Sequence, residues 1–279
     1  MNTTERIKAL IKLLQTERQA YRTLLKEELA AAVRTAPAEV ARVMAEGKDT
    51  AAPQIVLQTL EEICWEELSK EFAAFSAKIS PDLEEGLALL SRFSAPTVTR
   101  EDLTRELGTL EEALRTAVIN AANVREKIQI FNRYLFTLKQ FSVLPAVMGV
   151  RDTSFIRFLR TGKGSVMCMA SLYVCLGRRM DIEIEMVDLA GRVLLLVKDR
   201  TLNDSFIVDP LDGGKILHTQ DCKDYVLARA ISWDNNLFTP LSSRAVVRRF
   251  IANMIFILHK LRDERALAYL RSYLDILTH

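Results

Sequence analysis

One cysteine stands where its type and position could support nucleophilic chemistry. Cys168 follows Gly162-Lys163-Gly164 and lies in the first turn of a helix predicted from Ser165 to Met180. At a helix N-terminus the dipole favours the thiolate, which is the nucleophilic form of cysteine. Cys175 lies seven residues later on the same helix face, and free cysteines are commonly plain core residues. We therefore expect a buried structural thiol first, a reactive thiol without turnover second, and catalysis third.

Histidine is the side chain that most often serves as a base beside such a thiol. Of the three histidines, His218 is the one near the central motifs, whereas His259 and His279 lie in the last two predicted helices. An imidazole with a pKa near ~6.5 can exchange a proton close to neutral pH. A surface histidine in a loop is the commoner case, so His218 is a minor alternative base.

Other motifs resemble binding sites only superficially. Gly162-Lys163-Gly164 lacks the GxxxxGK[ST] spacing of a phosphate-binding loop and follows a predicted helix rather than a strand. Arg244, Arg248 and Arg249 form a cationic cluster with interspersed apolar residues, for which a solvated helix face is the default explanation over a nucleic-acid site. The cysteines are Cys64, Cys168, Cys175 and Cys222. Their spacing contains no CxxC pair, and we expect neither a metal nor a cofactor.

Composition argues against several classes of partner and location. The 38 Lys and Arg residues nearly balance the 36 Asp and Glu residues, so no strong field favours nucleic acid or an anionic membrane. The longest apolar runs, 166–176 and 250–258, have about half of the ~20 residues that a membrane span requires. The segment MNTTERIKALIKLLQTERQ lacks the apolar core of a signal peptide. With few cysteines for its length, the chain is expected to be cytoplasmic with reduced thiols.

Hydrophobic periodicity predicts a helical first half followed by a mixed core. Ile7, Leu10, Ile11 and Leu14 show the spacing of an amphipathic helix. Further helices are predicted at 37–45, 55–77, 82–93, 100–121, 124–141, 152–159 and 165–180, with a loop at 47–53. Ser80 and Thr99 are the predicted caps of two of them. Strands are predicted at 182–186, 193–197 and 206–208, with turns at 190–191 and 212–214.

Residues 242–279 predict a helical hairpin, with Ser242 or Ser243 as cap and a turn at Arg262-Asp263. This pair resembles one tetratricopeptide unit, which cannot form a solenoid alone because each repeat buries its face against neighbours. We therefore expect it to pack on the core. The apolar residues expected in that contact are Phe250, Met254, Ile257, Leu258, Leu267, Leu270 and Leu274.

An ordered set of segments carries a resemblance to a known family. They are Ser154–Leu159, Gly164–Tyr173 with Arg178–Met180, Gly191–Leu194, Phe206–Gly214, and Arg249 with Asn253 and Glu264–Leu267. Together they resemble the SirB-type transglutaminase-like family, from about Pro81 to the C-terminus. The first eighty residues have no counterpart in this resemblance.

The resemblance implies a papain-like site built from a nucleophile, a histidine and an acid. The matching positions are Cys168, Arg192 and Asp209, so the thiol and the acid are present and the catalytic histidine is not retained. An arginine, with a pKa above ~12, can stabilise a thiolate but cannot shuttle its proton near neutral pH. If the family geometry holds, Arg192 and Asp209 lie on adjacent strands and form an ion pair. The alternative is that Arg192 binds an anionic ligand.

These observations predict an α+β fold that is mostly helical, with a transglutaminase-like (papain-like) core of a central helix and a small antiparallel sheet. Three parts are expected: a helical N-terminal extension at 1–80, a transglutaminase-like domain with a helical lead-in at 81–241, and the tetratricopeptide-like hairpin at 242–279. The predicted function is that of a bacterial-type, non-catalytic scaffold that binds or regulates another protein.

Two alternatives stay open. One is a cysteine-dependent hydrolase or acyltransferase that uses Cys168 with an unusual base, which an alkylating probe on native and denatured protein would distinguish. The other is a structural module that forms homo-oligomers through its N-terminal helices, especially Thr4 to Ala32. Light scattering with and without residues 1–80 would test that alternative.

Overall fold

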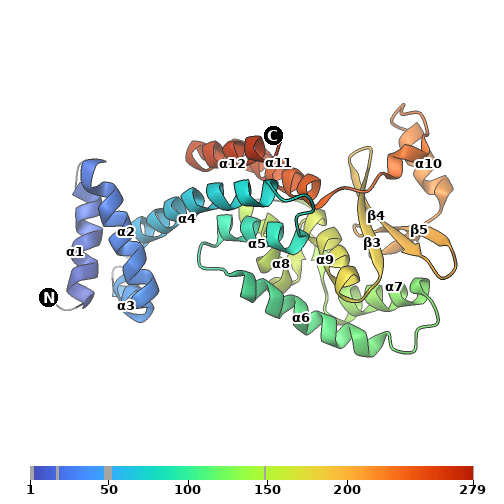
Figure 1. The fold of residues 1–279 in the computed structure, drawn as a ribbon, viewed down its shortest axis with the longest axis horizontal. Coiled ribbons are helices and arrows are strands. Elements are labelled where there is room, and N and C mark those ends of the chain that lie inside the picture. The colour runs from blue at the N-terminus through green and yellow to red at the C-terminus, as the bar shows by residue number, and fades with distance from the viewer. Residues whose placement is uncertain (1–2, 17–18, 47–51, 148, 279) are drawn as a thin grey trace. The chain divides into compact units, whose positions relative to one another are not determined.

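The computed structural model describes residues 3–16, 19–46, 52–147 and 149–278. The chain forms two compact units, Met1–Glu71 and Phe72–His279, whose elements are labelled in Figure 1. None of the described helices combines the length and the apolar composition needed to cross a membrane. The predicted division into three parts, at 80 and 241, stays a prediction.

The first unit is helical and has a core of its own. It contains α1 (Thr3–Thr16), α2 (Gln19–Thr35), α3 (Pro37–Glu46) and the first part of α4 (Ala52–Ser76). The predicted amphipathic stripe of α1 is buried, and its residues Ile7, Ile11 and Leu14 pack with aliphatic side chains of the other three helices. The predicted loop at 47–53 falls mostly outside the described residues, and α4 already begins at Ala52.

The second unit combines helices with a small antiparallel sheet. Its helices are α5 (Leu83–Ser94), α6 (Arg100–Ala117), α7 (Val124–Asn132), α8 (Phe155–Thr161), α9 (Val166–Arg179), α10 (Thr219–Leu227), α11 (Ser243–Leu261) and α12 (Glu264–Ile276). Its strands are β1 (Ser142–Val143), β2 (Lys163–Gly164), β3 (Glu183–Leu189), β4 (Arg192–Asp199), β5 (Asp204–Asp209) and β6 (Lys215–Leu217). Short 3-10 turns occupy Val150–Thr153 and Asn235–Phe238. The prediction of a mostly helical α+β fold with a small antiparallel sheet is confirmed.

The larger sheet is an antiparallel meander of β3, β4, β5 and β6 in chain order. Leu189 pairs with Arg192 across the first turn, and Asp209 pairs with Lys215 across the last. Because neighbouring strands run in opposite directions, the first residue of β4 and the last residue of β5 lie at the same end of the sheet. β1 and β2 form a separate parallel pair.

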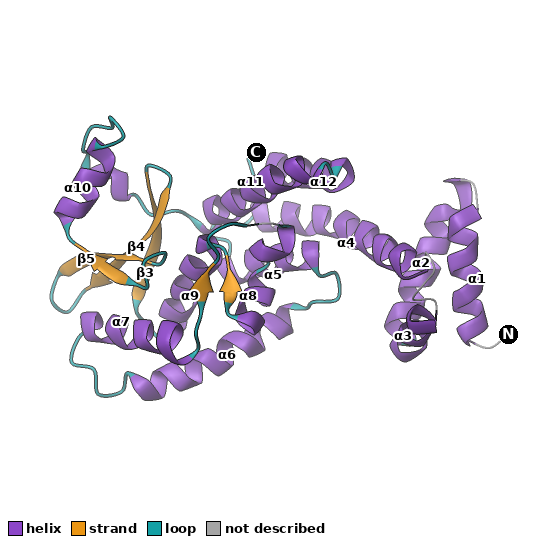
Figure 2. Cartoon of the chain, turned by 180° about the vertical axis from the view of Figure 1, so that it is seen from behind, coloured by secondary structure: helices purple, strands orange, loops and turns teal. Residues whose placement is uncertain are grey.

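Helix α9 is the central element of the second unit, as predicted. Every residue from Met167 to Gly177 is buried, because α9 packs against β3, β4 and α6. The opposite face of the sheet is covered by α10, whose Cys222 and Val226 pack with Val187 of β3. Figure 2 shows the sheet between α9 and α10. Ile184 and Met186 of β3 are buried, whereas Glu183 and Glu185 are partly exposed and pair with Lys198, so the alternation in this part of the sequence reflects one buried and one partly exposed face.

The structure differs from the prediction in the second half of one helix and in the surroundings of His218, among other places. The helix predicted at 124–141 is α-helical only to Asn132 and continues as a π-helical turn at Arg133–Leu138. His218 was expected in a loop, but it directly precedes the unpredicted helix α10. The backbone N–H of His218 donates to the Asp221 carboxylate (2.8 Å), which satisfies one of the donors at this helix start.

Side-chain caps fix the starts of several helices. Thr99 caps α6 as predicted: Asp102 N–H donates to its hydroxyl (3.2 Å), and Thr99 N–H donates to the Asp102 carboxylate (3.0 Å). Ser242 caps α11 in the same way by accepting from Ala245 N–H (3.2 Å). The predicted cap Ser80 is wrong, because α5 begins at Leu83 and Asp82 is its N-cap residue.

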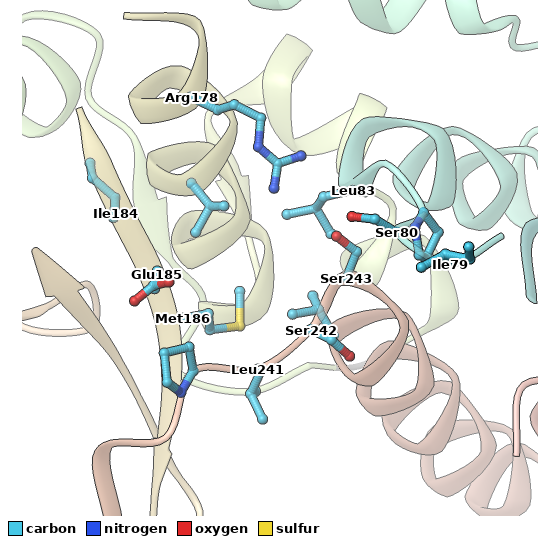
Figure 3. A pocket seen from close by; sticks show the side chains of 14 residues that line it. Ile79, Ser80, Leu83, Arg178, Ile184, Glu185, Met186, Leu241, Ser242 and Ser243 are labelled. Atoms are coloured by element: carbon cyan, nitrogen blue, oxygen red, sulfur yellow. The ribbon is translucent and has the colours of Figure 1, made fainter. Parts of the chain in front are cut away.

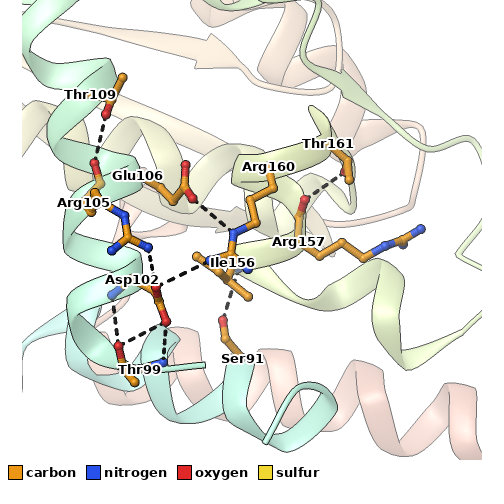
Figure 4. Close-up of polar contacts among 10 residues, drawn as sticks. All are labelled: Ser91, Thr99, Asp102, Arg105, Glu106, Thr109, Ile156, Arg157, Arg160 and Thr161. Carbon is orange, nitrogen blue, oxygen red and sulfur yellow. Dashed lines mark hydrogen bonds and ion pairs between the residues drawn. The ribbon is translucent and has the colours of Figure 1, made fainter. Parts of the chain in front are cut away.

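Polar contacts hold the lead-in helices α5 and α6 against α8 (Figure 4). Ile156 N–H at the start of α8 donates to Ser91 Oγ in α5 (3.2 Å). Arg160 of α8 reaches Glu106 (3.1 Å) and Asp102 (3.6 Å) of α6. These contacts position the 3-10 turn and α8, which come directly before the entry to α9.

The terminal helices α11 and α12 pack on the core, as expected. The residues named for this contact are buried, apart from the half-buried Leu274. Tyr273 of α12 lies 4.8 Å from the Phe72 ring and 6.1 Å from the Phe93 ring between ring centroids. Each large side chain buried in this way contributes roughly 1.5–3 kcal/mol, so the hairpin is an integral part of the second unit.

Two glycines of the lead-in helices should respond in opposite ways to substitution by alanine. Gly86 lies at the close approach of α5 and α11, whereas Gly108 of α6 lies next to open space. A Cβ at Gly86 of α5 would lie 2.4 Å from Val247 Cγ2 and 3.0 Å from the Phe75 ring, whereas a Cβ at Gly108 of α6 would meet nothing within 4 Å. Gly86→Ala should lower the free energy of unfolding by about 1–3 kcal/mol through overpacking. Gly108→Ala should raise it by about 0.5–1 kcal/mol through helix propensity. Chemical denaturation measures both, and equal stabilisation by the two changes would contradict the packing.

Candidate functional site

Cys168 is the third residue of α9 and is fully buried. The Ser165 hydroxyl caps the helix by accepting from Cys168 N–H (3.4 Å), and the same oxygen lies 3.4 Å from Cys168 Sγ. The thiol also lies 3.5 Å from the Thr153 carbonyl oxygen, which accepts from it. These contacts satisfy a neutral thiol, since an S–H group donates to a carbonyl but a thiolate cannot.

The environment of Cys168 disfavours its thiolate. Burial raises the pKa of the Cys168 thiol to about 11, and the hydrogen bonds from Ser165 offset only part of that effect. The position at the start of α9 would lower the pKa through the helix dipole in a solvated site. In this fold desolvation outweighs the dipole, and the thiol is protonated near neutral pH.

Arg192 and Asp209 meet at one end of the sheet. Arg192 is the first residue of β4, Asp209 is the last residue of β5, and an Arg192 guanidinium N–H donates to Asp209 Oδ2. The Asp209 side chain has no exposed surface, whereas 29% of the Arg192 side chain is exposed. The other oxygen, Asp209 Oδ1, accepts from Leu211 N–H (2.9 Å). The ion pair expected from the resemblance is therefore present, with its carboxylate buried and hydrogen-bonded on both oxygens.

Tyr225 of α10 belongs to the same cluster, although the sequence did not indicate it. The Arg192 guanidinium carbon lies 5.0 Å from the centroid of the Tyr225 ring, and that of Arg229 lies 3.6 Å from it. A guanidinium over an aromatic face is attracted by the ring quadrupole. Arg192 is thus held by a carboxylate and an aromatic ring, and α10 is tied to the start of β4.

A second set of polar contacts supports the loop after Asp209. Asn132 of α7 donates to the Gly214 carbonyl oxygen (2.6 Å) and accepts from the Tyr173 hydroxyl of α9 (2.5 Å). Gly214 has φ of +76°, and a Cβ there would lie 2.3 Å from Asn132 Oδ1. The corresponding signal in the sequence is Asn132 itself, a polar residue inside an otherwise amphipathic helical segment.

A cavity of about 730 Å³ lies against the residues that cover Cys168 and Asp209. Its lining contains Thr153 and Ser165, which contact the thiol, and Leu211, whose N–H binds Asp209. Cys168, Arg192 and Asp209 are not themselves among its lining residues in the described part of the chain. Cys168 and Asp209 therefore lie behind residues of the cavity wall and are not part of its exposed surface.

His218 does not join this cluster. Its side chain is exposed at the start of α10, whereas Cys168 has no exposed surface. Among the contacts of the described residues, none links the His218 imidazole to Cys168. Nor do three or more His, Cys, Asp or Glu side chains gather as metal ligands anywhere in the described ranges.

A smaller cavity of about 240 Å³ lies where α5, β3, α9 and α11 meet (Figure 3). Arg178 and Glu185 are the charged residues of its lining, and both have partners. Arg178 donates to Asp82 (3.0 Å), and Glu185 pairs with Lys198 (2.6 Å). With its charges already paired inside the protein, this cavity is a structural junction.

Comparison with known proteins identifies one family. The family model described as "Transglutaminase-like superfamily" matches residues 101–252, which is more than half of the chain. The matched range contains Cys168, Arg192, Asp209 and His218. No significant match is found among curated proteins or among solved structures.

The state of Cys168 predicts slow alkylation in the native protein. At pH 8 iodoacetamide should label native Cys168 at least about a hundredfold more slowly than denatured Cys168, because a buried thiol with a pKa of about 11 supplies little thiolate. The native rate should rise as the pH approaches 11. Mass spectrometry of the peptides separates Cys168 from Cys64, Cys175 and Cys222, which are also buried. Native labelling as fast as in the denatured control would contradict this account.

Proposed function

This chain belongs to the transglutaminase-like superfamily, and on that basis we propose that it is a member that binds a partner without catalysing acyl transfer. The observation that carries the proposal is the ion pair between Arg192 and the buried Asp209. Under this proposal the chain is a SirB-type relative in which Arg192 replaces the catalytic histidine.

The placement of the three candidate residues supports this correspondence. A papain-like site requires a thiol at a helix start, a base, and an acid that orients the base. Cys168 occupies the start of α9, Arg192 the start of the second strand of the meander, and Asp209 the end of the third. Asp209 contacts the residue at the position of the base, as an orienting acid would.

The chemistry of these residues argues against turnover. Acyl transfer by a thiol requires a thiolate and a group that passes its proton to the leaving group. The Cys168 thiol has a pKa of about 11. A guanidinium stays protonated near neutral pH and cannot act as that base. Moreover, the Arg192 guanidinium forms an ion pair with Asp209 and a cation–π contact with Tyr225. Its positive charge therefore stabilises the Asp209 carboxylate and not a Cys168 thiolate.

A cysteine-dependent hydrolase or acyltransferase is the runner-up. It would require motion that exposes Cys168 and a base other than Arg192, with His218 as the low-ranking choice. The burial of the thiol and the exposure of His218 both disfavour it.

The proposed partner of the scaffold is another protein. A second candidate function is the formation of homo-oligomers through the first unit, and the exposed side chains of that unit favour it. Tyr21 and Leu24 of α2 are 63% and 60% exposed, and Leu13 of α1 is 39% exposed. Exposed large apolar side chains such as these are candidates for contacts with a second copy of the chain. The expected segment, Thr4 to Ala32, contains all three.

A turnover assay tests the proposal. Purified protein should show no transamidase, peptidase or deamidase activity that depends on Cys168, because its site lacks a base. The matched variant Cys168→Ala defines the background of the assay. In a second variant, Arg192→His, the pH dependence of Cys168 alkylation should acquire an inflection from the imidazole, near ~6.5 if its pKa is unperturbed. Turnover that disappears in Cys168→Ala would refute the non-catalytic proposal.

A further inference from the structure

The cavity beside the candidate site has the size and lining of a small-molecule site. Its volume of about 730 Å³ falls within the ~300–1,000 Å³ that is typical of ligand pockets. Its lining residues are Val143, Leu144, Pro145, Ala146, Val147, Thr153, Ser165, Val166, Met167, Leu211, Asn253, Phe256, Ile257, Lys260 and Leu261. Most of these side chains are aliphatic, so the cavity is suited to an apolar chain.

One face of α11 forms a wall of this cavity. The wall residues Asn253, Phe256, Ile257, Lys260 and Leu261 follow the spacing of a single helix face. The opposite face of α11 is already buried against the core of the second unit. Phe256 is nevertheless 63% exposed and Leu261 56% exposed, as is Leu211 on the loop after β5 at 56%. Large apolar side chains thus remain uncovered where they border the cavity, which is unfavourable without a ligand.

The charge of the lining defines the other end of a ligand. Lys260 is the only charged residue among the lining residues that the structure describes. Its ammonium nitrogen lies 4.2 Å from the centroid of the Phe256 ring, and no carboxylate among the described residues forms an ion pair with it. Asn253, Thr153 and Ser165 add neutral polar groups. An apolar cavity with one cation and no lining carboxylate is complementary to an anion with an apolar body.

We infer that this cavity binds a free medium-chain fatty carboxylate, with the methylene chain against the aliphatic lining and the carboxylate at Lys260. The inference goes beyond the proposed function, because it assigns a small-molecule ligand to the surface that covers Cys168 and Asp209. It rests on the proposed function in one respect: the fatty carboxylate is a bound ligand and not a substrate of Cys168.

Titration calorimetry of the full chain with octanoate, decanoate and dodecanoate, below their micelle-forming concentrations, tests the inference. Binding should be saturable with one site, and the affinity should rise about fourfold per added methylene, which is ~0.8 kcal/mol converted at ~1.4 kcal/mol per tenfold. Lys260→Gln should weaken dodecanoate binding by up to about fivefold, as for a partly exposed charge pair. Lys260→Glu should weaken it further.

A matched control is Lys139→Gln, which removes another exposed lysine that lies over an aromatic ring, Tyr134, but is not among the cavity-lining residues. This control should bind dodecanoate as the unchanged protein does. Phe256→Ala, at an exposed position that should tolerate truncation, should lose affinity because it removes apolar lining.

Four outcomes would overturn the inference. The first three are the absence of saturable binding, equal affinity for dodecylamine and dodecanoate, and binding only to vesicles of anionic phospholipid. The fourth is dodecanoate binding that is unchanged in Lys260→Glu, since that result would show that the carboxylate is not held by the Lys260 ammonium. Turnover at Cys168 in the separate assay would refute the non-catalytic proposal and leave this binding result unaffected.

Discussion

A carboxylate without exposed surface needs fixed partners, and Asp209 has two, the Arg192 guanidinium and the Leu211 N–H. Burying an unpaired carboxylate costs several kcal/mol, so the end of β5 cannot be placed where it is unless the start of β4 brings a cation to it. Arg192 in turn lies over the Tyr225 ring, which connects the pair to α10. The strand ends, the following loop and the covering helix are therefore positioned by one ion pair.

This arrangement separates the thiol from the charges of the site. The positive charge of Arg192 is compensated by Asp209, and Cys168 is held by the neutral groups of Ser165 and Thr153. Under the proposed function, an acid that once oriented a base now holds a structural arginine, and the thiol beneath the cavity is part of the core. What stays accessible is the cavity with Lys260 at its edge, which fits binding better than bond-making.

Local patterns were sufficient to predict most elements of the second unit. The apolar run that follows Gly164 predicted α9, alternation predicted the meander, and Thr99 and Ser242 were correct caps because each acts on its own first turn. Placing Arg192 beside Asp209 required more than a pattern, since the two are seventeen residues apart, and it came from the family resemblance.

The features that the sequence did not indicate depend on contacts between distant segments. Tyr225 reaches Arg192 only because α10 folds over the sheet, and Asn132 reaches Gly214 across eighty-two residues. The cavity is lined by several separate segments, so no single motif encodes it. The predicted start of α5 at Asp82 lies within one residue of the observed start, and only the cap residue was wrong, because Ser80 and Asp82 are both good caps by residue type.

A double-mutant cycle of Arg192→Leu and Asp209→Asn, followed by chemical denaturation under reducing conditions, tests most directly whether this ion pair is the structural centre of the site. Each single change leaves a partner unpaired and should destabilise by an amount on the order of 3–5 kcal/mol, less where water reaches the partly exposed Arg192. The double change should cost less than the sum, with a coupling free energy above about 0.5 kcal/mol. Effects that are additive within that margin would mean that the two side chains do not stabilise one another, and would contradict the account.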